Sequence, residues 1–237
     1  AVQSAVMAPA RTLVVIPALD EVGTIGDVVA EVRNLGFDCV VIDDGSTDGT
    51  AAAANRVGAW TVTLPLNLGV GGAMRTGFRF AVERGYDRVI QVDGDGQHPP
   101  SAIPILLEAA DAGFDLVIGS RFAEGYEASS HRRAAMRALA WLVSRRSGVH
   151  LDDVTSGFRV ISEPLLSSFA RSYPAEYLGD TVEAILQAAA SGATITQVSV
   201  PMKTRASGSA TSSVVATGHL ARVGVSMLAG KPQRMSR

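Results

Sequence analysis

The chain has 237 residues, of which 47% are hydrophobic, and its formal net charge is −2. This length can bury one full-sized hydrophobic core, and the lack of a basic bias argues against a nucleic-acid-binding protein. The single cysteine, Cys39, excludes a disulfide framework and is best explained as a small buried hydrophobe.

Residues 1–10 are expected to be a disordered leader, because their mildly apolar stretch is too short for the core of a signal peptide. Residues 11–237 are expected to form a single domain. No window offers the roughly 18 uninterrupted apolar residues that a membrane span requires, and the nearest, 213–230, is interrupted by His219 and Arg222. We therefore expect a cytoplasmic protein, with peripheral contact at the inner face of the membrane as an open alternative.

Five apolar runs alternate with helical stretches along the first half of the chain. Each run is continuously apolar instead of alternating, which indicates strands covered on both faces. The sequence therefore predicts an α/β fold with a mostly parallel sheet and helices on both faces. The predicted strands are 12–17, 39–43, 60–64, 88–92 and 116–120, and the predicted helices are 24–35, 48–57, 71–83 and 100–112.

The second half has a different pattern. A helix over 131–146 is followed by an irregular segment over 152–161, a helix around 181–190 and a strand over 193–201. A Ser/Gly-rich stretch after Lys203 is interpreted as a mobile loop, and a last apolar helix is predicted over 214–228.

The predicted helix 131–146 carries five arginines that flank Trp141 and several aliphatic residues. This composition is typical of an interfacial amphipathic helix that meets anionic lipid. It also fits a core-packed helix with solvated arginines, or a dimer contact. The sequence leaves these alternatives open.

Polar residues follow all five predicted strands. Ligands of open α/β sheets bind at the carboxyl ends of the strands, so these residues are expected to share one edge and form one site. They are Asp20, Glu21, Asp43, Asp44, Asn67, Asp93, Asp95 and Arg121.

The stretch "RVIQVDGDGQHPP" places Asp93 and Asp95 on either side of one glycine at the end of the fourth strand. Two such carboxylates can converge on one cation, and hard oxygen ligands suit Mg²⁺ or Mn²⁺. We interpret the pair as a clamp for a metal and a diphosphate, with Gln97 or His98 as a further ligand. The alternative is an ordinary hydrophilic turn, in which Asp and Gly are also common.

Two further motifs support a nucleotide site. In "VVIDDGSTDGT", Asp43 can accept hydrogen bonds from a base or a ribose hydroxyl, whereas Asp48 is also explained as a helix cap. In "NLGVGGAMRTG", the glycines allow close approach of the backbone and Arg75 offers a fork for phosphate. A dinucleotide loop and a phosphatase aspartate pair would both follow the first strand, so we set these alternatives aside.

The motifs "VVIPALDE", "VVIDDGSTDGT", "NLGVGGAMRTG", "VDGDGQHPP", "IGSR" and "TSGFRV" occur in this order. Together they resemble glycosyltransferase family 2, and its dolichol-phosphate mannose synthase-like branch in particular. The resemblance covers roughly 13–201. It implies a GT-A fold with a Rossmann-like sheet, in which 11–120 form the nucleotide-sugar half and 121–237 the acceptor half with a C-terminal helix.

The resemblance also implies roles for individual residues. A divalent cation, Mg²⁺ or Mn²⁺, would be held by Asp93, Asp95 and Gln97. Catalytic roles would fall to Asp95, Arg121, Asp153 and Asp180, with Arg159 near the acceptor. The nucleoside-diphosphate sugar would lie against Pro17, Ala18, Glu21, Asp43, Asp44, Arg75, Asp93, Gly94 and Asp95, together with Asn67 at its strand end.

The function implied is metal-dependent, inverting transfer of a sugar from a GDP-mannose or UDP-glucose type of donor to a polyprenyl-phosphate-like acceptor. Two alternatives stay open. One is transfer to a hydroxyl acceptor with Asp180 as the base, since a hydroxyl needs a base within hydrogen-bond reach. The other is a non-catalytic protein that binds nucleotide sugars.

Overall fold

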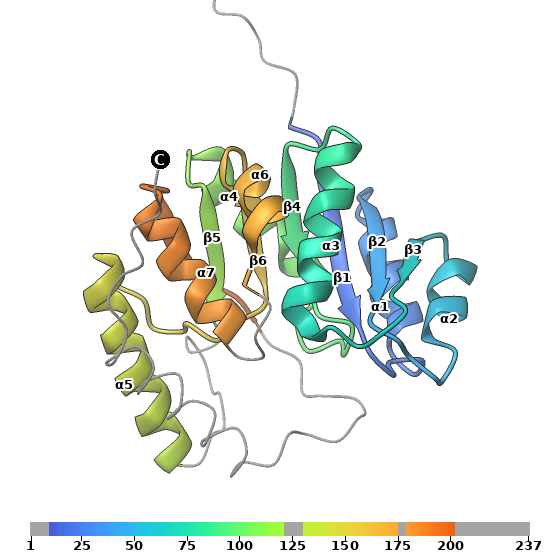
Figure 1. Ribbon diagram of the computed structural model, residues 1–237, viewed down its shortest axis with the longest axis horizontal. Coiled ribbons are helices and arrows are strands. Elements are labelled where there is room, and N and C mark those ends of the chain that lie inside the picture. Colours follow the sequence, from blue (N-terminus) through green and yellow to red (C-terminus); the bar gives the residue numbers. More distant parts are fainter. Residues whose placement is uncertain (1–9, 121–129, 175–178, 202–237) are drawn as a thin grey trace, which may run out of the picture.

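The computed structural model describes residues 10–120, 130–174 and 179–201, and for residues 130–132, 179 and 180 it describes the backbone alone (Figure 1). Seven strands form one sheet in the order β3-β2-β1-β4-β6-β5-β7. All of them run parallel except β6, which is antiparallel to both of its neighbours. The strands are β1 (Thr12–Ala18), β2 (Asp38–Asp43), β3 (Trp60–Thr63), β4 (Arg88–Gln91), β5 (Leu116–Ser120), β6 (Arg159–Ser162) and β7 (Ile195–Ser199).

Helices cover both faces of this sheet, and each face has its own apolar cluster. One face carries α1 (Ile25–Asn34), α2 (Thr50–Arg56), the short 3-10 helix η1 (Pro100–Ala102) and α4 (Ile103–Asp111). The other carries α3 (Gly69–Glu83), α5 (Ser130–Ser147), α6 (Leu165–Ser172) and α7 (Gly179–Ala190). The predicted mostly parallel α/β sheet with helices on both faces is confirmed.

Alternate residues of β1 show why its run is continuously apolar. Leu13 and Val15 belong to one cluster and Val14 and Ile16 to the other, and all four are fully buried. Cys39 is also buried, and its burial raises the pKa of the thiol to about 11. The expectation of a small buried hydrophobe at this position is therefore confirmed.

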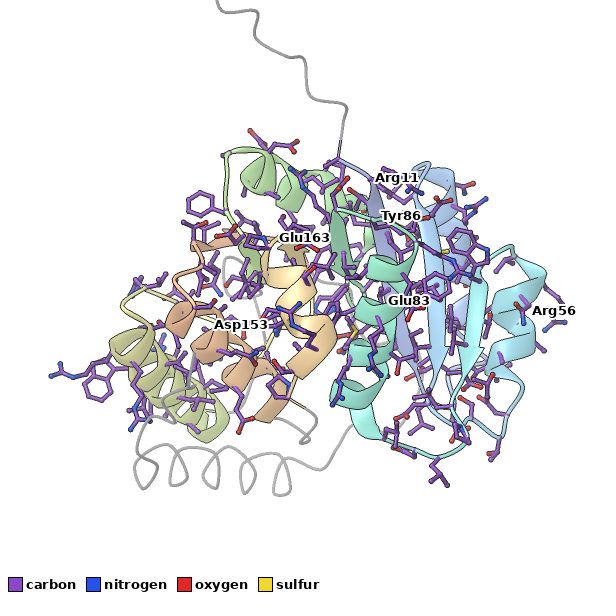
Figure 2. The ribbon with its side chains drawn as sticks, turned by 45° about the horizontal axis from the view of Figure 1, so that its top comes forward. Arg11, Arg56, Glu83, Tyr86, Asp153 and Glu163 are labelled. Carbon is purple, nitrogen blue, oxygen red and sulfur yellow. The ribbon has the colours of Figure 1, made fainter. Side chains whose placement is uncertain are left out.

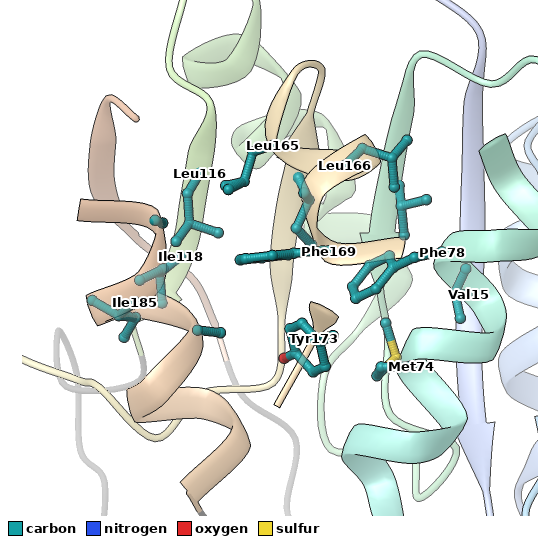
Figure 3. Packing of buried hydrophobic residues seen from close by; sticks show 14 of the residues in the cluster. Val15, Met74, Phe78, Leu116, Ile118, Leu165, Leu166, Phe169, Tyr173 and Ile185 are labelled. Atoms are coloured by element: carbon teal, nitrogen blue, oxygen red, sulfur yellow. The ribbon is translucent and has the colours of Figure 1, made fainter. Parts of the chain in front are cut away.

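The cluster under α3 and α6 is built around aromatic rings (Figure 3). Phe78 of α3 lies 5.8 Å from Phe169 and 5.0 Å from Tyr173, measured between ring centroids. Such tilted and edge-on contacts add to the free energy gained from area burial. They join α6 to α3, and so pack the second half of the chain against the first.

The expectation of an irregular segment over 152–161 is wrong at its carboxyl end. β6 (Arg159–Ser162) lies there, between β4 and β5. It pairs antiparallel with residues about 70 positions earlier in the chain, in the register Gln91 with Arg159. Four residues are too few to show a period, and the pairing is not local, so the sequence pattern did not reveal it. Helix α6 was not anticipated either.

Arg11 packs at the end of the sheet where β1 and β4 begin (Figure 2). Its guanidinium lies 4.7 Å from the centre of the Tyr86 ring and donates to the carbonyl of Arg84 at 3.0 Å. The Tyr86 hydroxyl donates to Asp38 at 2.8 Å. Burial, reinforced by this contact with Asp38, raises the pKa of Tyr86 to about 12. These contacts connect the amino ends of β1, β2 and β4. They lie at the end of the sheet opposite to the carboxyl ends, where the polar site residues are predicted.

Gly77 lets α3 pack closely on β1, and replacing it tests that packing. A Cβ at Gly77 would lie 2.3 Å from Cγ1 of Val15, a fully buried side chain. We expect Gly77→Ala to lower the free energy of unfolding by about 1–3 kcal/mol, measured by urea denaturation. A Cβ at Gly26, in α1, meets nothing within 4 Å, so Gly26→Ala is the matched control and should cost nothing. Equal stability of the two variants would contradict the packing described.

Some sequence predictions lie outside the described residues. They are residues 1–9 of the predicted leader over 1–10, the loop after Lys203, the helix over 214–228 and the apolar window 213–230. Within the described part of the chain, no helix is both long enough and apolar enough to cross a membrane.

Candidate active site

The carboxyl ends of β1 to β5 lie at one edge of the sheet, because these five strands run in the same direction. The loops after β1 and β2 are bound to each other there. The backbone N–H of Asp20 donates to Ser46 Oγ at 2.9 Å, and that of Thr47 donates to Asp20 Oδ1 at 2.8 Å. The N–H of Glu21 donates to Thr50 Oγ1 at 2.9 Å. Two loops far apart in sequence thus form one rigid wall of the site.

Asp48 supports this wall by an Asx-type turn. Its Oδ1 accepts from the N–H of Thr50 at 3.0 Å and from Thr50 Oγ1 at 2.6 Å, and its Oδ2 accepts from the N–H of Val22 at 3.0 Å. Burial acts to raise the pKa of Asp48, but the hydrogen bonds from Thr50 and Val22 outweigh it and lower the pKa. Asp48 precedes the N-cap residue of α2, Gly49, so its Asx-type turn lies directly before the helix and supports the Asx-type alternative drawn from the sequence.

Asp43 and Asp44 are both buried, at 2% and 4% exposure. Asp43 Oδ1 accepts from the N–H of Ser46 at 3.0 Å, which closes the turn after β2. Asp44 Oδ1 accepts from the N–H of Leu68 at 2.7 Å, which ties the loop after β2 to the loop after β3. Burial raises the pKa of Asp44, and the charge of Asp43 adds to this, against the opposing effect of the Leu68 and Gly69 N–H groups.

Replacing Asp44 with asparagine tests this shift. The folded state holds the Asp44 proton more tightly than the unfolded state does. Ionisation of Asp44 therefore lowers the free energy of unfolding as pH rises from 3.8, the ordinary pKa of this carboxyl, through its raised pKa in the folded state. Asp44→Asn keeps an oxygen for the Leu68 N–H and removes the titration. We expect the stability of the wild type relative to Asp44→Asn to fall as pH rises through this window, in denaturant titrations at several pH values. A stability difference that does not depend on pH would contradict the assignment.

Pro17, Ala18 and Gly94 meet where β1 and β4 end. A Cβ at Gly94 would lie 3.3 Å from both Ala18 Cβ and the Pro17 carbonyl oxygen, a tight contact that glycine avoids. Thr24 Oγ1 donates to the Gly94 carbonyl at 2.7 Å and also lies 3.2 Å from Glu21 Oε2. The structure thus brings Gly94 together with Pro17, Ala18 and Glu21, the three donor-site residues predicted near the first strand. Thr24 belongs to the same group, and the sequence analysis did not assign it to the site.

Asn67 and Arg75 stand at the start of α3. Asn67 Oδ1 accepts from the N–H of Gly69 at 3.0 Å, which starts the helix, and Asn67 itself is exposed. Arg75 is half-buried two turns further along. It has no hydrogen bond or ion pair to other described residues, so its guanidinium is available to an anionic ligand at this edge.

Asp93 lies just beyond β4 and is partly exposed, with 33% of its side chain accessible. Gln91 Nε2 donates to its Oδ1 at 3.3 Å, and His98 Nδ1 approaches its Oδ2 within 3.2 Å, without the alignment of a hydrogen bond. His98 is buried and its ring stacks on Phe158, with centroids 5.3 Å apart. The orientation of the Asp93 carboxylate is therefore limited by neighbours on two sides.

Asp95 is held differently. Its Oδ1 accepts from the N–H of Gln97 at 3.0 Å, which closes a tight turn around Gly96, whose φ is +74°. Gln97 follows the two carboxylates within four residues of the chain, and both Asp95 and Gln97 are half-buried. The structure therefore keeps the predicted carboxylate pair and Gln97 together in one short loop.

Gly157, of the "TSG" motif, packs directly against Asp93. A Cβ at this position would lie 2.8 Å from both carboxylate oxygens of Asp93 and 2.9 Å from Gln91 Nε2. Neither distance is sterically acceptable, so only glycine fits without moving the carboxylate. The sequence pattern identified this motif but gave Gly157 no role, because the contact joins residues that are 64 positions apart, as their numbers show.

The donor set of this loop fits a hard divalent cation. It consists of two carboxylates and one amide, and Mg²⁺ sites commonly use one or two carboxylates with phosphate oxygens as further ligands. Among the residues that the structure describes, no group of three or more His, Cys, Asp or Glu side chains is placed to hold a metal ion by itself. A cation here would therefore need oxygen ligands from a bound substrate as well.

The acceptor-side predictions fall on a second loop, which ends at β6. Asp153 is 1% exposed, and its Oδ1 accepts from both the N–H and Oγ1 of Thr155 at 3.0 Å (Figure 2). Its carbonyl accepts from Gln197 Nε2 at 2.7 Å. Arg159 is fully buried and its Nη2 donates to the carbonyl of Ser156 at 2.7 Å, so its guanidinium lies in the interior of the protein.

Two predicted catalytic residues cannot be placed. Arg121 lies outside the described residues. Asp180 belongs to the first turn of α7, and its side chain lies outside the described part. A pocket of about 260 Å³ lies at the opposite end of β5, beside Asp115, and none of the predicted site residues lines it. We place the site at the carboxyl edge because the carboxylates and the glycines that permit close approach converge there.

The sheet order, the single antiparallel strand β6 and the polar loops at the carboxyl edge define the GT-A fold of glycosyltransferases. Solved structures agree. Glucosyl-3-phosphoglycerate synthase from Mycobacterium tuberculosis, in complex with Mn²⁺, uridine diphosphate and glucosyl-3-phosphoglycerate, superposes with a TM-score of 0.72 at 23% identity, over 93% of this chain and 79% of that one. Mannosyl-3-phosphoglycerate synthase from Rubrobacter xylanophilus gives 0.67 at 18% identity, over 96% and 77%.

The family model for glycosyl transferase family 2 matches residues 13–166, and the chain belongs to this family. Polyprenol monophosphomannose synthase of Mycolicibacterium smegmatis is 34% identical over 167 residues, 66% of this chain and 63% of that protein. Undecaprenyl-phosphate mannosyltransferase of Micrococcus luteus is 34% identical over 160 residues, 63% of this chain and 65% of that protein. These relatives place the chain in the dolichol-phosphate mannose synthase-like branch, and the match spans a little under two thirds of their length.

Proposed function

We propose that the protein transfers a sugar from a nucleoside-diphosphate sugar to a polyprenyl phosphate, with inversion at the anomeric carbon. The observation that carries the proposal is the loop of Asp93 and Asp95, which lies at the same carboxyl edge of the sheet as the buried Asp43 and Asp44. The names of the two relatives above support the lipid phosphate as acceptor and mannose as the sugar.

The donor would lie across the wall formed by the loops after β1 and β2. Asp43 is at the end of β2, where a carboxylate can accept hydrogen bonds from the base or the ribose. Gly94 would line the donor pocket in the loop that packs on Ala18 and Pro17, and Arg75 would supply a cation for the phosphates. Asp93, Asp95 and Gln97 would hold Mg²⁺ or Mn²⁺, which supplies positive charge to the departing diphosphate. The Mn²⁺ in the related synthase structure supports a divalent cation.

The acceptor side needs little acid–base chemistry in this proposal. A phosphate oxygen is already anionic, so it can attack the anomeric carbon without a strong base. Arg121 would bind phosphate, and a catalytic part for Asp153 stays a prediction. The site's main contribution is to align the nucleophile opposite the leaving group.

A transfer assay tests the proposal. The protein is incubated with radiolabelled GDP-mannose or UDP-glucose, with Mn²⁺ or a chelator, and with polyprenyl phosphate in detergent. We expect label in the lipid extract only when metal and polyprenyl phosphate are both present. Label that enters a hydroxyl acceptor instead would favour transfer with Asp180 as the base. Donor binding without transfer to either acceptor would contradict the proposal and indicate a nucleotide-sugar-binding protein.

A further inference from the structure

Helix α5 is the most basic element of the described chain. Its 18 residues contain five arginines and no Asp or Glu, although the whole chain has a net charge of −2. In Figure 1 the helix lies at the outer flank of the molecule, beside α7 and far from α2. Its charge is therefore concentrated on one side of a protein that has no basic character overall.

The two faces of α5 differ. Leu139, Ala140 and Val143 are buried in the apolar cluster that also contains residues of α7, at 4%, 4% and 0% exposure, and Met136 is buried at 4%. This face agrees with the core-packed alternative drawn from the sequence. A structural role, however, accounts only for the inward half of the helix.

The outer face combines an aromatic ring with positive charge. Arg137, Trp141 and Arg145 are spaced by four residues, so they lie one above the other on the same side of the helix. Trp141 is 64% exposed, and the guanidinium of Arg145 lies 5.9 Å from its ring. Arg146 is exposed next to it. We call these four residues the α5 basic face.

A membrane surface fits this face better than a protein or a nucleic acid does. Tryptophan is favoured at the boundary of headgroups and acyl chains, where its ring is half apolar and half polar. Arginines around it are attracted to anionic phospholipids, and the attraction adds up over several residues. An acidic protein partner would gain from the arginines, but a lone Trp141 offers it little apolar area.

The helix is also connected to the acceptor-side loop. Ser144 Oγ accepts from the N–H of Leu151 at 2.9 Å and lies 3.2 Å from the carbonyl of the same residue. Leu151 is buried and directly precedes the segment that carries Asp153 and Gly157. The helix is therefore joined directly to the loop that packs on the predicted metal carboxylate.

We propose that the α5 basic face binds the surface of membranes that contain anionic phospholipid, and so brings the acceptor-side loop to the lipid. The binding itself needs only the α5 basic face. Its purpose, delivery of a polyprenyl phosphate acceptor, rests on the proposed function.

Vesicle sedimentation tests this binding in the absence of polyprenyl phosphate, so that its result does not depend on transfer activity. The full chain is mixed with vesicles of phosphatidylcholine alone or of phosphatidylcholine with phosphatidylglycerol. We expect binding to the anionic vesicles only. Arg137→Gln with Arg145→Gln should lower the partition coefficient by about 25-fold, from about 1 kcal/mol for each arginine. Trp141→Ser should lower it by about tenfold.

The matched control is Arg79→Gln with Arg171→Gln, which removes the same charge from exposed sites on α3 and α6. It should bind like the wild type. A Trp60→Phe background leaves Trp141 as the only tryptophan, and its emission should shift to the blue when anionic vesicles are added. The proposal is overturned if the α5 variants bind like the control. It is also overturned if Trp141→Ser changes self-association of the protein but not vesicle binding, which would make the face a contact between copies of the chain.

Discussion

An asparagine in place of Asp95 is expected to lower the rate of sugar transfer by about a thousandfold while leaving the fold intact. Asp95→Asn keeps an oxygen that can accept from the Gln97 N–H, so the turn should persist. It removes one of the two carboxylate charges that would hold the cation. Metal assistance is worth several kcal/mol of transition-state stabilisation, and each 1.36 kcal/mol is a factor of ten in rate.

The measurement is the turnover number at saturating donor, together with nucleotide binding in the presence and absence of Mn²⁺. The metal-dependent part of the binding should disappear in Asp95→Asn. Asp115→Asn is the matched control, because Asp115 also accepts from a backbone N–H, that of Thr194 at 2.7 Å, but at the opposite end of the sheet. That variant should retain near-normal turnover. Normal turnover in Asp95→Asn would show that this carboxylate is not a ligand of the cation.

Alanine at Gly157 is expected to lower turnover by about a hundredfold without unfolding the protein. The added methyl group would lie 2.8 Å from both oxygens of the Asp93 carboxylate. That carboxylate is the far end of a partly exposed side chain with rotatable bonds, so we expect the added methyl group to displace it while the backbone stays. A displacement of about 1 Å in a catalytic constellation can cost about a factor of 100 in rate.

Two readouts separate this effect from simple loss of stability. The unfolding temperature of Gly157→Ala should stay close to that of the wild type, and its affinity for Mn²⁺ in the presence of nucleotide should fall. Gly77→Ala provides the opposite control, since it should lose stability but keep metal affinity in the folded fraction. Turnover of Gly157→Ala within a factor of three of the wild type would contradict the role given to this contact.

The parallel strands and their common edge could be predicted because they depend on local patterns. Continuous apolar runs such as Thr12–Ala18 have both faces buried, and polar residues mark the point where each strand ends. Once the strands are known to be parallel, the meeting of Asp43 and Asp93 at one edge follows from topology. The carboxylate pair was found for the same reason, since its two members are close in sequence.

Contacts between distant segments could not be predicted in this way. β6 is only four residues long, which is too short for a period to be detected in the sequence. Its partner β4 lies about 70 positions earlier in the chain, so no local signal reveals the pairing either. The packing of Gly157 against Asp93 depends on that strand, and glycines are common in loops whether or not they pack against a functional side chain. Similarly, the hydrogen bond from Leu68 to Asp44 gives this carboxylate a structural task that its position after β2 does not reveal.

The most direct test of the account is the position of Mn²⁺ in a crystal grown with the metal and a nucleoside-diphosphate sugar, located by anomalous scattering. The account predicts one strong peak within about 2.0–2.4 Å of carboxylate oxygens from Asp93 or Asp95, with the donor diphosphate supplying further ligands. A bound donor with no metal at this loop, or a metal held by other side chains, would contradict it.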